Sequence, residues 1–90
     1  MYYVYVLKSI RNGKLYTGFT NNLEKRLRLH REGKVHSTKW RLPVELLYYE
    51  AYLAEDDARE REKYLKTGWG RNYIQKFLKK SLALKSEGKV

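Results

Sequence analysis

The sequence predicts an α/β domain of the α+β type, in which a small three-stranded antiparallel sheet is flanked by three helices in the order β-β-α-β-α-α. Two runs rich in tyrosine and β-branched residues, at 2–8 and 15–20, predict strands. Asn12-Gly13 lies between them and favours a type I′ hairpin turn, because both residues tolerate a positive φ. Apolar residues recur at helical spacing in three later segments, which predicts three helices.

The predicted hairpin places two tyrosines on the same side of the sheet. With Asn12-Gly13 as a two-residue turn, Tyr5 pairs with Thr20. Side chains alternate between the two faces along a strand, so Tyr5 and Tyr16 share a face. A shift of two residues through a longer loop keeps this arrangement and would bring the tyrosines opposite each other, whereas a shift of one residue breaks it. The alternative is that these are ordinary half-buried core tyrosines.

A first helix is expected directly after the hairpin. Asn21 can cap it in a capping box with Glu24. Leu23 and Leu27 then lie one helical turn apart, and Gly33 is a typical helix stop.

The remaining elements are delimited by proline and glycine. Pro43 limits the entry to a third strand, Gly68 is expected to end the second helix, and Gly70 opens the last one. We therefore expect a polar, basic loop over residues 34–42, a third strand over 44–52, a second helix over 55–66 and a third helix over 71–85. Residues 1–85 form one domain in this prediction, and residues 86–90 form a frayed tail.

Composition excludes several classes of protein. The 90 residues suffice for one small domain with a modest core, and 42% of them are apolar, which is too many for a disordered tail. No apolar run is long enough to span a membrane and no signal peptide opens the chain. We therefore expect a cytoplasmic protein with no membrane partner, with association with the nucleoid as a further option. The absence of cysteine excludes disulfides, zinc fingers and thiol catalysis.

Charge is distributed unevenly along the chain, whose net charge is +10. Residues 22–41 hold seven basic and two acidic side chains, and residues 71–90 hold six and one. Residues 42–70 hold four basic and seven acidic side chains. A basic surface around one acidic segment suits a polyanion held near a metal-binding carboxylate. Charge alone favours a ribosome- or RNA-associated protein without chemistry.

The first predicted helix carries two candidate site residues. Arg26 and His30 lie four residues apart, so both can point toward one groove. Arg26 lies at the border of the apolar stripe, where a guanidinium can bind a phosphate with two hydrogen bonds. The alternatives are a surface arginine on a basic helix and a packed or capping histidine.

The second predicted helix supplies a carboxylate. Glu62 falls on the inward stripe with Ala58 and Leu65. A carboxylate there is costly unless a cation holds it, and a hydrated Mg²⁺ is a suitable partner. The alternative is a salt bridge with Lys66, and Glu60 is a competing candidate that fits the stripe less well.

Taken together, these spacings resemble a known family of nucleases. Tyr3-Val4-Tyr5 and Tyr16-Thr17-Gly18, followed by Arg26, His30 and Glu62, match the order and intervals of the core motifs of the GIY-YIG endonuclease domain. The resemblance covers almost the whole chain. It is closest to the small stand-alone bacterial branch, which also has a stretch similar to Arg41-Leu42-Pro43-Val44-Glu45-Leu46. One departure is that Tyr3 and Val4 replace the glycine and isoleucine of the first triplet.

The resemblance implies hydrolysis of a DNA phosphodiester with one Mg²⁺ or Mn²⁺ ion. Tyr5 would act as general base or water positioner with Tyr16 assisting, and His30 would assist proton transfer or hydrogen-bond a tyrosine. Arg26 would stabilise charge on the phosphoryl oxygens, and Glu62 would hold the metal. We expect Arg26 and Glu62 to converge on the face that carries the two tyrosines. Because tyrosine has a pKa of about 10, a base at neutral pH needs a cationic neighbourhood.

Binding residues are expected in the basic loop, which includes an aromatic side chain suited to base stacking. These are Lys34, His36, Lys39, Trp40 and Arg41. Asn72 corresponds to a polar residue near the end of the family domain, although its surroundings differ. Because the family elsewhere adds separate DNA-binding domains, a bare core is expected to recognise branched, flapped or single-stranded DNA, with RNA not excluded and the oligomeric state left open. The alternative function is a non-catalytic nucleic-acid-binding module with the same fold.

Overall fold

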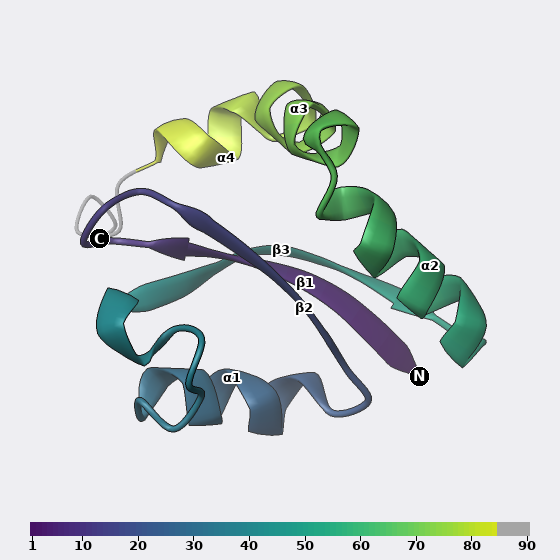
Figure 1. The fold of residues 1–90 in the computed structure, drawn as a ribbon, viewed down its shortest axis with the longest axis horizontal. Helices are drawn as coiled ribbons and strands as arrows, with labels where there is room; N and C mark the ends of the chain where they lie inside the picture. Colours follow the sequence, from purple (N-terminus) through teal and green to yellow (C-terminus); the bar gives the residue numbers. More distant parts are fainter. Residues whose placement is uncertain (85–90) are drawn as a thin grey trace.

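The computed structural model describes residues 1–84, which form a three-stranded antiparallel sheet with helices on both faces (Figure 1). The strands are β1 (Tyr2–Ser9), β2 (Leu15–Thr20) and β3 (Val44–Tyr52). Their order is β2-β1-β3, so the buried β1 lies in the centre and β2 is an edge strand. The predicted fold class is confirmed. The expected frayed tail, and the end of the expected third helix at Lys85, lie outside the described residues.

The turn between β1 and β2 is longer than the Asn12-Gly13 pair predicts. Gly13 donates its N–H to the Ser9 carbonyl at 2.8 Å, and Ser9 donates to the Lys14 carbonyl at 2.9 Å. The Asn12 side chain accepts from the Lys14 N–H at 2.9 Å, and Gly13 has a φ of 75°. These two backbone bonds and the Asn12 side-chain bond close a loop wider than a type I′ turn.

The wider loop shifts the register by two residues. Tyr5 lies opposite Gly18, and Thr20 lies opposite Tyr3, so the predicted pairing of Tyr5 with Thr20 is wrong. A shift of two residues leaves each side chain on the same face of the sheet, so Tyr5 and Tyr16 share a face as predicted. They are diagonal neighbours, because the residue opposite Tyr16 is Leu7.

The helices differ from the prediction mainly at their ends. They are α1 (Leu23–Arg31), the 3₁₀-helix η1 (Lys39–Arg41), α2 (Glu55–Leu65), α3 (Gly68–Phe77) and α4 (Lys79–Ala83). Asn22 caps α1 in place of Asn21, since its side chain accepts from the Lys25 N–H at 3.1 Å. The Thr67 hydroxyl caps α3, which begins before the glycine expected to open it. The expected third helix is divided into α3 and α4 at Leu78, whose backbone (φ −105°, ψ 30°) is not helical.

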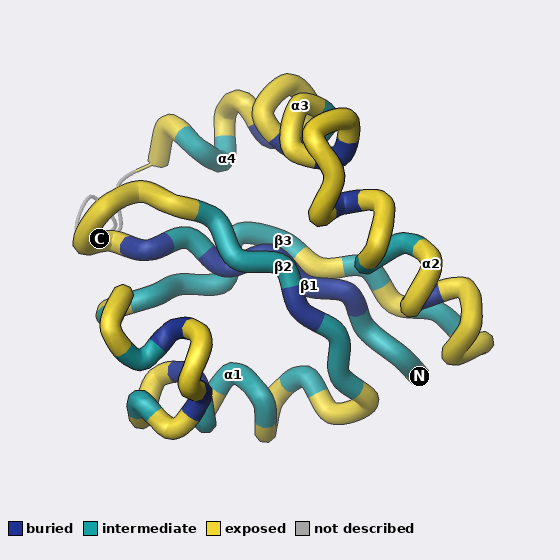
Figure 2. The backbone as a smooth tube through the Cα atoms, in the orientation of Figure 1, coloured by how far each residue is buried: buried dark blue, intermediate teal, exposed yellow. Residues whose placement is uncertain are grey.

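The helices cover the sheet from opposite sides. α1 lies on one face, and α2, α3 and α4 lie on the other (Figure 1). The face toward α2 and α3 carries the apolar core, in which Val4 and Val6 of β1 are fully buried. They pack with Ala58, Leu65, Ile74 and Leu78 from the helices. Figure 2 shows the same arrangement, with dark buried stretches along β1 between two partly exposed layers.

An ion pair fixes α2 on the sheet. Arg61 of α2 binds Glu50 of β3 through two hydrogen bonds of 2.9 and 3.0 Å, and Tyr52 donates to the same carboxylate at 2.5 Å. Although burial disfavours the charged carboxylate, Arg61 and the neighbouring tyrosines hold the pKa of Glu50 below its usual range. This contact and the packing of Ala58 and Leu65 together hold α2 on the sheet.

Within residues 1–84, none of the helices combines the length and apolar character that crossing a bilayer requires.

We predict that Gly70→Ala destabilises the protein and that Gly68→Ala does not. A Cβ at Gly70 would overlap the Tyr64 carbonyl oxygen and the Leu65 Cα, which are backbone atoms that cannot move aside alone. Overpacking of this kind costs about 1–3 kcal/mol. A Cβ at Gly68 meets nothing within 4 Å, so this variant is the matched control. Urea denaturation of both variants measures the difference, and equal midpoints would contradict the close packing of α3 on α2.

Candidate active site

Tyr5 is the centre of the candidate site. It lies in the middle of β1 with no exposed surface, and its ring crosses directly over Gly18 on the neighbouring strand. Any side chain at position 18 would overlap the Tyr5 ring and hydroxyl. The glycine of the Tyr16-Thr17-Gly18 triplet therefore provides the space that the tyrosine of the first triplet occupies.

The Tyr5 hydroxyl belongs to a buried chain of hydrogen bonds. It lies 2.8 Å from His30 Nε2, and His30 Nδ1 lies 2.7 Å from the Thr38 hydroxyl. Tyr5, His30 and Thr38 all have no exposed surface. Arg26 Nε donates to the Tyr5 oxygen at 3.4 Å, which leaves the Tyr5 proton for His30 Nε2. On this assignment, His30 Nδ1–H donates to Thr38.

Burial sets the protonation states of this chain. It lowers the pKa of His30 to about 4, with the Arg26 charge contributing, so the imidazole is neutral. Burial also raises the pKa of Tyr5, and Arg26 only partly opposes this effect. The hydrogen bond to Tyr5 raises the pKa of Arg26, with Tyr16 contributing. The Tyr5 phenol is therefore protonated in this state, contrary to the cationic activation that a tyrosine base needs.

Tyr16 connects this chain to the surface. Its ring centroid lies 5.4 Å from that of His30 and 6.4 Å from that of Tyr5, and its side chain is partly exposed. Tyr5, Tyr16, Arg26 and His30 thus lie together on the α1 side of the sheet.

Glu62 approaches from the other side of the sheet. The expectation that it reaches the tyrosines on their own face is wrong, because α2 packs on the opposite face through Ala58 and Leu65. Its carboxylate forms a 2.9 Å salt bridge with Lys66, the alternative that the sequence left open, and the Glu62 side chain is only 18% exposed. After burial and Tyr16, the charge of Glu62 also contributes to raising the pKa of Tyr5. The carboxylate therefore acts electrostatically on the tyrosine across the edge of the sheet.

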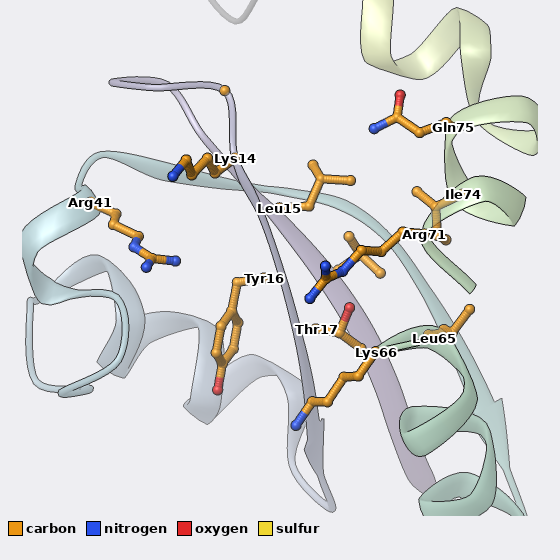
Figure 3. Close-up of a pocket in the computed structure, with 12 residues that line it drawn as sticks. Lys14, Leu15, Tyr16, Thr17, Arg41, Leu65, Lys66, Arg71, Ile74 and Gln75 are labelled. Atoms are coloured by element: carbon orange, nitrogen blue, oxygen red, sulfur yellow. The ribbon is translucent and has the colours of Figure 1, made fainter. Parts of the chain in front are cut away.

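A cavity of about 620 Å³ lies at this edge (Figure 3). Tyr16 and Thr17 both line it, and adjacent strand residues point to opposite faces. The cavity must therefore run along the free edge of β2, where the tyrosine side and the α2 side meet. Lys66, the partner of Glu62, lines it as well.

The side chains near Glu62 fit a metal site with one protein carboxylate and no other protein ligand. Among residues 1–84, no group of three or more histidine, cysteine, aspartate or glutamate side chains is arranged to hold a metal. Mg²⁺ keeps several waters and binds through one or two carboxylates plus substrate phosphates, so a single half-buried carboxylate is sufficient. Lys66 shows that a cation can be held at Glu62. Glu62 thus fits a hydrated Mg²⁺ that is completed by substrate.

Comparison with known proteins agrees with this constellation. The model of the GIY-YIG catalytic domain matches residues 1–76. The chain belongs to the GIY-YIG family. This is a family of nucleases, and membership supports a nuclease activity in general.

The relatives are small bacterial proteins. A UPF0213 protein of Bacillus licheniformis is 48% identical over 66 residues, which is 72% of this chain and 67% of that protein. A UPF0213 protein of Clostridium perfringens is 46% identical over 67 residues, covering 73% of this chain and 71% of the relative. These names state no activity. No solved structure matches the chain.

The expected binding loop contributes less to the site than the sequence suggests. Among its five candidates, only Arg41 lines the cavity. Lys34 forms a salt bridge of 3.2 Å with Glu32, and His36 is exposed. The ammonium of Lys39 lies 5.0 Å from the centre of the Trp40 ring, which is 73% exposed.

The remaining candidate residues differ in how well the sequence could identify them. Asn72 is exposed on α3 and does not line the cavity, so its role remains a prediction. Thr38 was missed because no periodicity links a loop residue to a histidine eight positions earlier. The sequence indicated Lys66 as the i+4 partner of Glu62, but it did not indicate that Lys66 lines the cavity. Arg71, which also lines the cavity, had no distinguishing signal.

We predict that His30 makes the protein acid-labile. The pKa is about 4 in the folded state and about 6.5 in the unfolded state, so only the unfolded chain takes up a proton between these values. Stability is therefore lost as pH falls from 6.5 to 4, by roughly 3 kcal/mol from this group. Urea unfolding across this range should show a larger loss for wild type than for His30→Gln. An identical loss in both would assign the acid lability to carboxylates instead.

Proposed function

We propose that this protein hydrolyses phosphodiester bonds of DNA with the help of one Mg²⁺ or Mn²⁺ ion. It acts in the cytoplasm, near the nucleoid, and selects DNA by structure or by weak sequence preference. The observation that carries the proposal is the buried Tyr5 hydroxyl held between the Arg26 guanidinium and a neutral His30. A binding protein has no need of a buried phenol in contact with both a cation and a proton acceptor.

The pKa shifts of Tyr5 and His30 favour a Tyr5 that passes a proton on during the reaction, as a relay, over a Tyr5 that is already deprotonated at rest. Burial raises the pKa of Tyr5 above its ordinary value and lowers that of His30 to about 4. Moving the proton from Tyr5 to His30 in the resting protein is therefore strongly unfavourable. The proton therefore passes to His30 Nε2 only as Tyr5 receives one from the attacking water, and Thr38 holds the imidazole in the tautomer that accepts it.

Arg26 controls access to this relay. Tyr5 has no exposed surface, so water or phosphate reaches its hydroxyl only when a neighbouring side chain moves, and Arg26 is in contact with that hydroxyl. The contact between Arg26 and the Tyr5 oxygen is long, at 3.4 Å, and a phosphate offers the guanidinium a charged, two-pronged partner. Arg26 would then stabilise charge on the phosphoryl oxygens while uncovering Tyr5.

Glu62 would hold the metal next to the scissile phosphate. When bound there, Mg²⁺ polarises the phosphoryl oxygen and neutralises the charge that develops on the leaving oxygen. Lys66 must release the carboxylate for this to happen. Ion pairs spaced i, i+4 on a helix are worth only a few tenths of a kcal/mol, and the Lys66 side chain is 53% exposed, so the lysine can move into solvent at little cost.

A non-catalytic nucleic-acid-binding module is the second candidate. Two observations favour it: the pKa of Tyr5 is raised, and Glu62 is already neutralised by Lys66. Both features are compatible with a site that has kept its fold and lost its chemistry.

We predict that Glu62→Gln abolishes cleavage and preserves binding. The substitution keeps the size and hydrogen bonding of the side chain but removes the charge that holds the metal. Binding should persist or tighten in EDTA, because removing the Glu62 charge leaves Lys66 free to attract phosphate. Cleavage of flapped, branched and single-stranded DNA is measured with Mg²⁺ or with EDTA. Glu60→Gln, on the exposed side of the same helix, is the control. Equal cleavage by wild type and Glu62→Gln, in preparations free of contaminating nucleases, would favour the binding module.

We predict that Tyr5→Phe lowers the cleavage rate and also costs stability. The change removes the hydroxyl of the relay and leaves His30 Nε2 without its partner, which costs about 1–3 kcal/mol. Tyr3→Phe, on the same strand and face, should change neither property strongly. Single-turnover cleavage at saturating DNA, with unfolding measured in parallel, separates the two effects. A Tyr5→Phe variant that cleaves at the wild-type rate would remove Tyr5 from the mechanism.

A further inference from the structure

The cavity along β2 carries more positive charge than the chemistry of cleavage requires. Of the described residues that line it, none is acidic and four are cationic: Lys14, Arg41, Lys66 and Arg71. Of these four cations, only Lys66 forms a salt bridge within residues 1–84. In the described part of the chain, the other three have no acidic partner.

We propose that this cavity binds the sugar-phosphate backbone of an unpaired nucleic-acid strand, next to the phosphate that is cleaved. The inference rests on the proposed function, because it places the strand on the Tyr16 side of the catalytic residues. It adds a phosphate-binding site, in which Lys14 and Arg71 take part, and it selects an unpaired strand over a duplex as the occupant.

The four cations converge from four separate elements. Figure 3 shows their side chains around one space beside Tyr16. Lys14 comes from the β1–β2 loop, Arg41 from η1, Lys66 from the end of α2, and Arg71 from α3. Charges that converge from four elements repel one another, so they are expected to gather only where an anion neutralises them.

The size of the cavity favours one strand. Its volume of about 620 Å³ lies within the roughly 300–1,000 Å³ of pockets that enclose small organic ligands. A duplex is too wide to enter such a space, since its major groove alone is about 12 Å across. The backbone of an unpaired strand can enter, and its phosphates can contact each cation in turn.

An exposed tryptophan adjoins one of the cavity residues. Trp40 precedes Arg41 in η1 and is 73% exposed. Aromatic side chains beside a basic groove bind unpaired bases by stacking, without sequence preference. Trp40 is one of the two tryptophans of the chain, so a change of fluorescence on binding reports on contact with bases.

Arg71→Gln tests the proposal, with Lys76→Gln as the matched control. Lys76 is exposed on the same helix and does not line the cavity, so both variants lose one charge from α3. The probe is a short fluorescent oligothymidylate, titrated in EDTA so that no cleavage occurs. Arg71→Gln should bind about tenfold more weakly. Its plot of log affinity against log salt should be shallower by about 0.7, the value for one phosphate contact on a single strand. Lys76→Gln should match wild type.

Two further measurements make the result decisive. Lys14→Gln, in a different element, should repeat the loss seen for Arg71→Gln. A blunt duplex of the same length should bind with the same affinity to wild type and Arg71→Gln. Equal oligothymidylate affinities for Arg71→Gln and Lys76→Gln would overturn the site, and an equal loss on the duplex would overturn the preference for an unpaired strand. Because binding is read in EDTA, failure of the nuclease function would leave this result unchanged.

Discussion

The Tyr5 hydroxyl is the group to which the rest of the site is adapted. A buried phenol without a hydrogen-bond partner costs about 1–3 kcal/mol, so its partners must be supplied by the fold. Gly18 leaves room for the ring, α1 supplies His30, and the loop before η1 supplies Thr38. The same bonds that satisfy this group also hold α1 and the loop on the sheet. Stability and chemistry therefore depend on one network, and a substitution in it affects both.

The second organising feature is the free edge of β2. Because β2 has no neighbour on one side, a side chain on either face of the sheet can reach the same cavity. The tyrosine network lies on the α1 side, and Glu62 lies on the α2 side. The distance between acid and tyrosine is thus set by how α2 packs on the sheet, to which both the buried Ala58 and Leu65 and the Arg61–Glu50 ion pair contribute. The ion pair contributes to the position of Glu62 although it lies on β3, at the other edge of the sheet.

Sequence could predict the parts of this arrangement that depend on short-range periodicity. Alternation along β1 and β2 placed Tyr5 and Tyr16 on one face in spite of a wrong turn, since a shift of two residues preserves parity. Helical spacing identified Glu62 as inward-facing, but periodicity does not say which face of the sheet a helix covers. Thr38 could not be found, because a loop residue acquires its role only when tertiary packing brings it to His30. The division of the last helix at Leu78 likewise leaves no proline or glycine signal.

The resting electrostatics explain how substrate can activate the site. After burial, the charge of Arg26 is the second cause of the low pKa of His30. A phosphate bound to Arg26 offsets that charge, so the pKa of His30 should rise when the substrate arrives. The same movement withdraws Arg26 from the Tyr5 oxygen and opens the hydroxyl to water. In the proposed mechanism, His30 would thus become more basic as the Tyr5 hydroxyl is exposed, and without substrate this hydroxyl would stay protonated and covered.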